Sequence, residues 1–345
     1  VDSSGVFPLF LQQGWNQIAN PFGYEILWDQ VKISIAQDKV NIEDALRQDK
    51  PQGLWEWDPS LSCYLYYNPD PADQFAIMRP WHGYWVYAAR AETIYFYPEP
   101  FFSLEKAEEN NQLNKKSILE WKIQLAVKQN NQQDLFNYLG IAKNAQATYN
   151  LFNPPAPFNH LDLVFTGNLA QDIKNPAPTL VWHFTIKNQS SDYPVTIFWQ
   201  GIESIPSNYN INLYDSLTQN WIDLRKTAKY IYQPKVSERH FYLLITTQNR
   251  LPLDQLGTKL EILQQSPHPL TEAITIKFKL PLNSLNSPLI FEVFNLWGEK
   301  ITTQTFPPPL TGSLHWKATD QKGQPIAPGC YLYHLKLNQY EILNK

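Results

Sequence analysis

Residues 118–128, ILEWKIQLAVK, alternate apolar side chains with other residues along their whole length. The apolar members that share one face are Leu119, Trp121, Ile123, Leu125 and Val127. Because successive side chains of a strand point to opposite faces, this period of two predicts a long β-strand with one buried face. The pattern recurs at roughly ten-residue intervals, which indicates a β-sandwich, in HLDLVF, TLVWHFTIKN, PVTIFWQG, NINLYDS, WIDLRK and RHFYLLIT.

The composition of the whole chain favours strands and turns. Aromatic residues make up 14% of the 345 residues, and there are 27 Pro but one Met. Aromatic side chains suit a pleated, half-buried surface, whereas Pro punctuates short elements. We therefore predict an all-β protein of three consecutive β-sandwich or immunoglobulin-like modules.

Changes in composition along the chain predict the boundaries of these modules. Residues 1–100 form an aromatic-rich small β domain, with short runs such as GLWEWDP and PWHGYWVYA between turn residues. Residues 101–117 are polar, lack apolar periodicity and are interpreted as a linker. Residues 118–250 form the sandwich described above, and residues 251–345 form a second sandwich of immunoglobulin-like size.

Charge and hydropathy exclude two classes of partner. The formal net charge is -4 and no basic run occurs, which argues against binding to nucleic acid. No apolar run approaches the ~20 residues that a membrane-spanning helix needs. Cys63 and Cys330 lie far apart and outside any CxxC pair, so we expect two unpaired, buried thiols.

The last 80 or so residues carry an ordered set of motifs, namely SPHPLTEAITIKFKLP, FEVFNLWGEKI and GSLHWKATDQKGQPIAPGCYLYHLK. This order resembles the FlgD-type immunoglobulin-like domain, a cousin of the C-terminal sorting domains of type IX secretion substrates. The resemblance implies an exported, modular, C-terminal position. The sequence departs from the FlgD-type pattern at Cys330 and in the Pro-rich loop TFPPPLTG. Its fold-defining positions are Gly298, Trp316, Asp320, Gly323, Gly329 and Tyr331.

The first 100 residues are similar to small β modules near the ends of secreted bacterial proteins. The features in common are the opening GWNQIANPF, then LWEWDP, and the late RPWHGYWVYA. This second similarity also implies a place at the cell surface.

Motifs with a known catalytic mechanism are missing from the sequence. There is no GxSxG, no P-loop and no HExxH, and the seven His never stand at metal-ligand spacing. The carboxylates Glu56 and Asp58 flank Trp57, and we interpret them as a solvated face and not as a glycosidase pair. Asp70 and Asp73, in NPDPADQ, are a weak calcium candidate, although turn formation also explains them. We therefore expect no catalytic residue and no cofactor, with Ca²⁺ as the open alternative.

Aromatic side chains of the first domain are the best candidates for ligand binding. On an exposed face they would stack on sugar rings, whereas in a small sandwich they would fill the core. The candidates are Trp55, Trp57, Tyr64, Tyr66, Trp81 and Trp85. Open edge strands are a second kind of contact surface, and TIYFY and YLLIT would be adhesive if exposed.

Together these features predict a non-catalytic protein of the bacterial cell surface or exterior. It would be the C-terminal region of a larger secreted chain, or its processed product, and would serve adhesion, presentation or self-assembly into a surface structure such as a filament. One alternative is a carbohydrate-binding accessory region of a secreted hydrolase, and another is an enzyme with an unrecognised site. Protein partners, further copies of the chain and glycans all remain candidate partners.

Overall fold

The computed structural model describes residues 5–42, 45, 50–67, 77–100, 119–145, 149–157, 160–188, 192–247, 256–266, 273–285, 287–307 and 312–344. Strands dominate throughout, and the helices among these residues are short 3-10 turns. The predicted all-β fold is confirmed. The chain divides into two compact units, and the second consists of Ala177–His183, Pro206–Lys226 and His240–Lys345. The first unit holds the rest of the chain.

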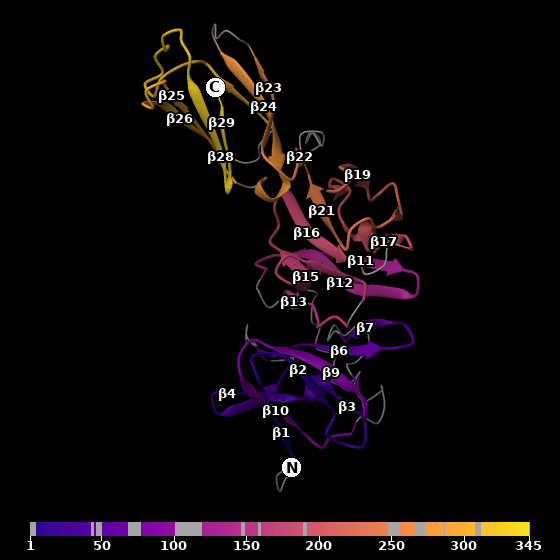
Figure 1. The fold of residues 1–345 in the computed structure, drawn as a ribbon. Coiled ribbons are helices and arrows are strands. Elements are labelled where there is room, and N and C mark those ends of the chain that lie inside the picture. Colours follow the sequence, from indigo (N-terminus) through magenta and orange to yellow (C-terminus); the bar gives the residue numbers. More distant parts are fainter. Residues whose placement is uncertain are drawn as a thin grey trace. The chain divides into compact units, whose positions relative to one another are not determined.

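The N-terminal domain of the first unit has two four-stranded sheets (Figure 1). One runs in the order β1–β10–β4–β5, with bounds Phe7–Leu11, Glu92–Phe96, Lys32–Ile35 and Asp38–Asn41. The other runs β2–β9–β6–β7, with bounds Gly14–Ala19, Gly83–Ala88, Gln52–Asp58 and Cys63–Tyr66. A short pair, β3 (Ile26–Leu27) and β8 (Ile77–Met78), and the 3-10 turn η1 (Trp28–Gln30) complete it.

The core of this domain lies between the two sheets. One sheet contributes Leu11, Ile33, Ile94 and Phe96, and the other contributes Ile18, Leu54, Tyr84 and Val86. Trp28 fills the centre at 1% exposure. The arrangement is a small sandwich stabilised by the burial of apolar side chains.

The remainder of the first unit is one continuous sheet in the order β16–β14–β15–β12–β11–β17–β20, with β13 paired to β15. β12 and β15 are parallel, whereas β11 and β12 form a long antiparallel hairpin. β14 also contacts β11 and β12, so the sheet folds over on itself. The 3-10 turn η3 is Ile202–Ser204. The strands are β11 Leu119–Gln129, β12 Gln132–Ala142, β13 Leu151–Phe152, β14 Asp162–Phe165, β15 Leu169–Lys174, β16 Thr179–Lys187, β17 Val195–Gln200 and β20 Lys229–Tyr232.

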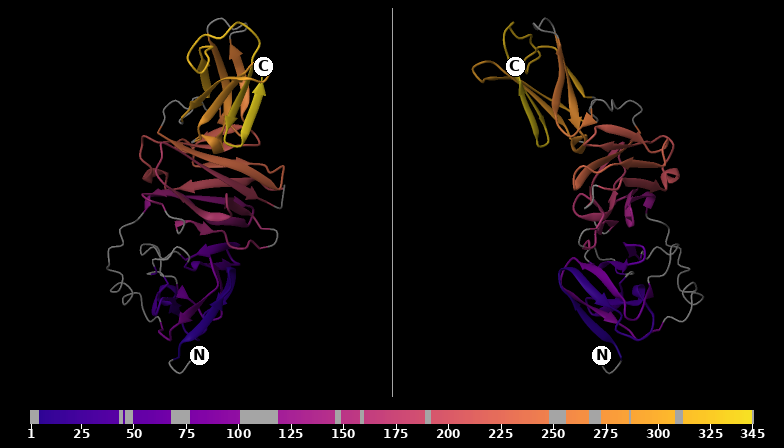
Figure 2. Two further views of the ribbon diagram at one scale, coloured as in Figure 1. Left: turned by 90° about the vertical axis from the view of Figure 1, so that its left-hand side faces the viewer. Right: turned by 45° about the vertical axis from the view of Figure 1, so that its right-hand side comes forward.

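The second unit contains the sheet section β19–β18–β21 and two further sheets. In one of these, β24 pairs with β22, β23 and β27, and the other runs β26–β25–β28–β29; Figure 2 shows the two as separate layers. The 3-10 turn η5 is Leu282–Ser284. The strands are β18 Asn210–Asp215, β19 Asn220–Asp223, β21 Glu238–Thr246, β22 Leu256–Gly257, β23 Glu261–Ser266, β24 Ile274–Pro281, β25 Leu289–Phe294, β26 Lys300–Phe306, β27 Ser313–Trp316, β28 Leu332–Leu337 and β29 Tyr340–Asn344.

The fold-defining residues of the C-terminal resemblance occupy turns and core of this unit. Gly298 has φ +82 in the β25–β26 turn. Gly323 has φ +78 in the loop after β27. In that loop Asp320 Oδ1 accepts hydrogen bonds from the N–H groups of Lys322 and Gln324, each at 2.8 Å. Tyr331 donates its hydroxyl to the carbonyl of Ala327 at 2.6 Å, and Gly329 lies beside its ring. These contacts close the turns between the strands.

The expectation that Cys330 is buried is wrong, and the two candidate contact strands, which would be adhesive only if exposed, are interior. TIYFY lies in β10, between β1 and β4, and YLLIT lies in β21, between β18 and β16, so both segments are interior strands. Of the two thiols, Cys63 is buried as expected, whereas Cys330 is exposed. The alternation of a strand indicates a buried face, but it does not indicate which strands end a sheet.

Trp316 is the anchor of the C-terminal sandwich, because its indole is 2% exposed and lies edge-on to Phe291, with ring centroids 5.7 Å apart. Its Nε1 donates to the carbonyl of Thr319 at 3.2 Å. We expect Trp316→Ala to lower the free energy of unfolding of this unit by about 3–5 kcal/mol, because it removes a large buried side chain and leaves a cavity. Urea denaturation of the full chain, followed by hydrogen exchange of β24 and β28, measures this loss. The matched control is Trp297→Ala, which truncates a Trp that is 86% exposed; equal stability of the two variants would contradict the assignment.

Candidate binding site at the Trp81 turn

Trp81 lies in the turn between β8 and β9, and its side chain is 95% exposed. Its φ is +65, in the left-handed region that bulky side chains rarely adopt. Pro80 precedes it with a ring-fixed φ, so the two residues match the central positions of a type II turn, where Gly is usual at the second. The indole is therefore held out from the domain by a strained backbone.

A buried carboxylate lies beneath this turn. Glu56, in β6, is 7% exposed and accepts a hydrogen bond from the hydroxyl of Tyr67, while His82 Nδ1 contacts its other oxygen. Arg79 NH1 lies 3.9 Å from Glu56 Oε2, and Arg79 Nε lies 3.9 Å from Glu25 Oε1. We call Glu56, Tyr67, Arg79 and His82 the Glu56 cluster. Two of its members, Arg79 and His82, directly flank the Pro80–Trp81 pair.

The base of the turn is fixed by two further polar contacts. The backbone N–H of Arg79 donates to the hydroxyl oxygen of Tyr84 at 2.8 Å. Burial raises the pKa of Tyr84 to about 12, so this phenol is neutral at physiological pH. Asn20, 7% exposed, donates its amide to the carbonyl of Met78 at 2.9 Å. The end of β8, where the chain enters the turn, is thus tied to β9 and to the loop after β2.

The structure separates Trp81 from the other predicted binding aromatics. Trp55 is 3% exposed and lies 4.5 Å, centroid to centroid, from Tyr66. Trp57 contacts Tyr64 edge-on at 5.2 Å, and Trp85 contacts Trp15 at 6.5 Å. These five candidates are buried or half-buried and contact other aromatic rings. Among the six candidates, Trp81 alone is freely exposed.

The prediction that Glu56 and Asp58 form a solvated face is wrong for Glu56. β6 is covered on both faces at its centre, where Leu54, Trp55 and Glu56 are all buried. Sequence reasoning also missed the roles of Tyr67, Arg79 and His82. The signal for the turn was the sequence RPWHG, in which an aromatic residue follows Pro and no Gly takes the left-handed position.

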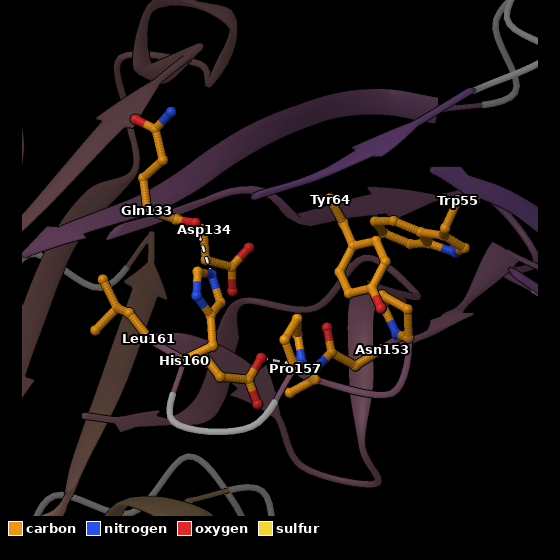
Figure 3. A pocket seen from close by; sticks show the side chains of 11 residues that line it. Trp55, Tyr64, Gln133, Asp134, Asn153, Pro157, His160 and Leu161 are labelled. Carbon is orange, nitrogen blue, oxygen red and sulfur yellow. Dashed lines mark hydrogen bonds between the residues drawn. The ribbon is translucent and has the colours of Figure 1, made fainter. Parts of the chain in front are cut away.

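A second polar site lies at a small cavity between β7 and β12 (Figure 3). Tyr64 and Trp55 lie on one side, and Asp134 and His160 lie on the other. A bulge in β12, opposite Leu125–Val127, re-aims the side chains around Asp134. The cavity volume of about 20 Å³ accommodates about one water molecule, far below the ~300 Å³ of a small-molecule site.

This cavity contains a pair of carboxyl groups. Asp134 Oδ2 accepts the backbone N–H of Leu163, and Asp162 Oδ1 accepts the side-chain amide of Asn153, each at 2.8 Å. Burial, together with the nearby charge of Asp162, raises the pKa of Asp134 to about 7. Burial also raises the pKa of Asp162 and lowers that of His160. The site therefore favours a singly protonated pair beside a neutral imidazole.

The metal predictions have two different outcomes. Asp70 and Asp73, the calcium candidate, lie outside the residues that the structure describes. Within the described ranges, no group of three or more His, Cys, Asp or Glu side chains is arranged to hold a metal ion. None of the helices in that part of the chain has the length and hydropathy that a membrane crossing requires.

No family of known sequences and no curated protein matches the chain. Among solved structures, the chain is similar to the adhesin domain of Epf from Streptococcus pyogenes, at 9% identity over 65% of this chain and 89% of that one. It is also similar to dimeric latent PorU from Porphyromonas gingivalis, at 11% identity over 86% of this chain and 28% of that one. The TM-score is 0.21 in both cases, which is too low for either likeness to assign a function.

Replacement of Trp81 is expected to stabilise the protein. Trp81→Asn removes a side chain with few contacts and places an αL-tolerant residue at φ +65, so we expect a gain of about 0.5–1 kcal/mol in the free energy of unfolding. Thermal unfolding of the two proteins measures it. A loss of more than about 1 kcal/mol would mean that the indole contributes to packing and is not held out from the domain.

The raised pKa of Asp134 gives a pH dependence with a defined sign. The folded chain binds a proton that the unfolded chain releases, so this carboxyl's contribution to stability is complete below about pH 4 and is lost as the pH rises through about 7. Asp134→Asn removes the charge and keeps the acceptor for Leu163. We expect its melting temperature to match wild type near pH 4 and to exceed it by roughly 2–4 °C at pH 8.

The control for this prediction is Asp38→Asn, which removes an exposed carboxylate. Its melting temperature should follow that of the wild type at both pH values. An Asp134→Asn variant that also follows the wild type at pH 8 would show that the carboxyl pair is not a source of charge strain.

Proposed function

We propose that this chain is a non-catalytic, modular β protein of the bacterial cell surface or exterior, and that it serves adhesion through the Trp81 turn. The observation that carries the proposal is a Trp that is 95% exposed at a φ of +65. Exposure of a large aromatic ring and a strained backbone both reduce stability, and such strain is typical of functional positions. Trp is also the side chain most enriched among residues that dominate binding energy.

The non-catalytic part of the proposal is supported by the cavity at Asp134. Its perturbed carboxyl pair has the acid–base character of a catalytic dyad, but the space beside it holds about one water. The pair is accounted for by hydrogen bonds to Leu163 and Asn153. A structural role for the pair is therefore sufficient.

The exterior location is supported by the resemblance of the last 80 or so residues to FlgD-type domains. The positions that carry this resemblance form the turns and core of the C-terminal sandwich, as described above. In exported bacterial proteins such a domain implies a C-terminal position in a modular chain.

Self-assembly is a second candidate function, and the edge strand β29 favours it. Among the described strands, β29 ends the order β26–β25–β28–β29 and pairs with β28, and its Leu343 is 64% exposed. An exposed edge offers unpaired backbone groups to a strand of another copy. Light scattering of the full chain separates the two, because assembly through β29 predicts a mass that rises with concentration.

A solid-phase assay on intact cells tests the adhesion proposal directly. Labelled full-length chain is applied to a panel of immobilised bacterial and animal cells, together with Trp81→Ala and the matched surface variant Trp297→Ala. We expect wild type to bind at least one cell type, Trp81→Ala to bind at least tenfold more weakly, and Trp297→Ala to bind as wild type does. Absence of binding by the wild type, or equal loss in both variants, would contradict the proposal.

A further inference from the structure

We infer that the Trp81 turn is a glycan-binding site that takes the face of a neutral pyranose ring. This inference rests on the proposed adhesive function and assigns the chemical class of its ligand. It combines three features of the turn: an open aromatic ring, half-exposed hydrogen-bonding groups on the residues that flank Pro80 and Trp81, and a balance of charges among those groups.

The indole of Trp81 provides the plane. At 95% exposure, almost none of its surface is covered by other side chains, so an apolar face of a ligand has access to the ring. Pro80 and the Arg79–Tyr84 hydrogen bond restrict the backbone where the chain enters the turn. A Trp on a restricted backbone has two rotatable side-chain bonds and loses little entropy when a flat partner stacks on it.

The residues on either side of the Pro80–Trp81 pair, and Glu25, carry polar groups on side chains that are themselves half exposed. The side chains of Arg79, His82 and Glu25 are 49%, 44% and 45% exposed. Both contacts of the Arg79 guanidinium with carboxylates are 3.9 Å long, beyond hydrogen-bond distance, so its N–H groups can still donate. Glu25 supplies an acceptor. Sugar hydroxyl groups are both donors and acceptors, and they match this mixed set.

The charge balance favours a neutral ligand over an anionic one. Among the described residues of the turn, the guanidinium of Arg79 faces two carboxylates, Glu56 and Glu25, and Glu56 also contacts His82. A site for sulfate, phosphate or a sialic acid would present an excess of positive charge or a bidentate Arg free of acidic partners. Here the carboxylates of Glu56 and Glu25 would repel an anionic ligand at close range.

The surroundings also favour a sugar over a protein partner. Dominant aromatic residues of protein interfaces lie within an apolar core surrounded by a rim. Beyond Trp81, the exposed large apolar side chains in the described part of residues 1–100 are Phe10, in β1, and Leu61, in the β6–β7 turn, and neither belongs to the Trp81 turn. A lone ring flanked by charged and polar groups matches one sugar unit better than a protein face.

A glycan array of neutral and anionic oligosaccharides, probed with the full-length chain, tests the inference. The neutral set is cello-, chito-, manno- and galacto-oligosaccharides, and the anionic set is their sulfated and sialylated counterparts. We expect binding to at least one neutral series. Trp81→Phe should keep binding within about tenfold because a ring remains, whereas Trp81→Asn should lose at least tenfold without loss of stability. Trp297→Asn is the matched control and should bind as wild type does.

Treatment of the cells separates failure of this inference from failure of the adhesive function. Periodate, which cleaves vicinal diols, should abolish Trp81-dependent binding to cells, and protease treatment should leave it. Binding that survives periodate and is lost after protease would overturn the glycan inference and leave adhesion to a protein partner. Binding to anionic glycans alone would also overturn it. Absence of wild-type binding to both cells and array would overturn adhesion and glycan recognition together.

Discussion

The buried carboxylate of Glu56 is the constraint that fixes the Trp81 turn. Glu56 lies in the middle of β6, between β7 and β9, and its two oxygens contact Tyr67 and His82. A carboxylate removed from water is stable only when donors surround it. Tyr67 and His82 contact the two oxygens, and Arg79 adds a positive charge 3.9 Å from one of them. Because His82 and Arg79 bracket the Pro80–Trp81 pair, their interactions with the carboxylate also restrain the turn that exposes the indole. Stability of the core and geometry of the surface are thereby linked.

The two polar sites of the first unit differ in exposure and in the groups that their carboxylates contact. The Glu56 cluster lies at a surface, keeps half-exposed donors and holds a ring in water. The Asp134–Asp162 pair is enclosed, and its members satisfy backbone and side-chain donors of neighbouring segments. Burial raises pKa values at both sites: those of Tyr67 and Tyr84 at the first, and those of Asp134 and Asp162 at the second. In this protein a shifted pKa therefore does not distinguish the surface where binding is expected from the enclosed site, since burial is the largest cause of the shift at both.

The sequence predicts the strands well and the sites poorly, and the reasons are physical. Alternation in residues 118–128 is a local property, and β11 follows it closely. Glu56 is buried because other segments pack against both faces of β6, whereas an alternating sequence predicts one buried face only. Asp134 and Asp162 meet only because β12 carries a bulge and β14 folds back against it. Six aromatic candidates looked alike in the sequence, and only the backbone conformation distinguishes Trp81 from the buried ones.

The proposed site requires that the turn hold the backbone of Trp81 rigid in its left-handed conformation. NMR relaxation of the full chain labelled with ¹⁵N-tryptophan measures this rigidity, with Trp81 assigned through Trp81→Phe. We expect a backbone order parameter for Trp81 near ~0.85, the value of rigid elements. A value below ~0.6, typical of flexible loops, would contradict it, because a mobile turn would present no fixed ring to a ligand.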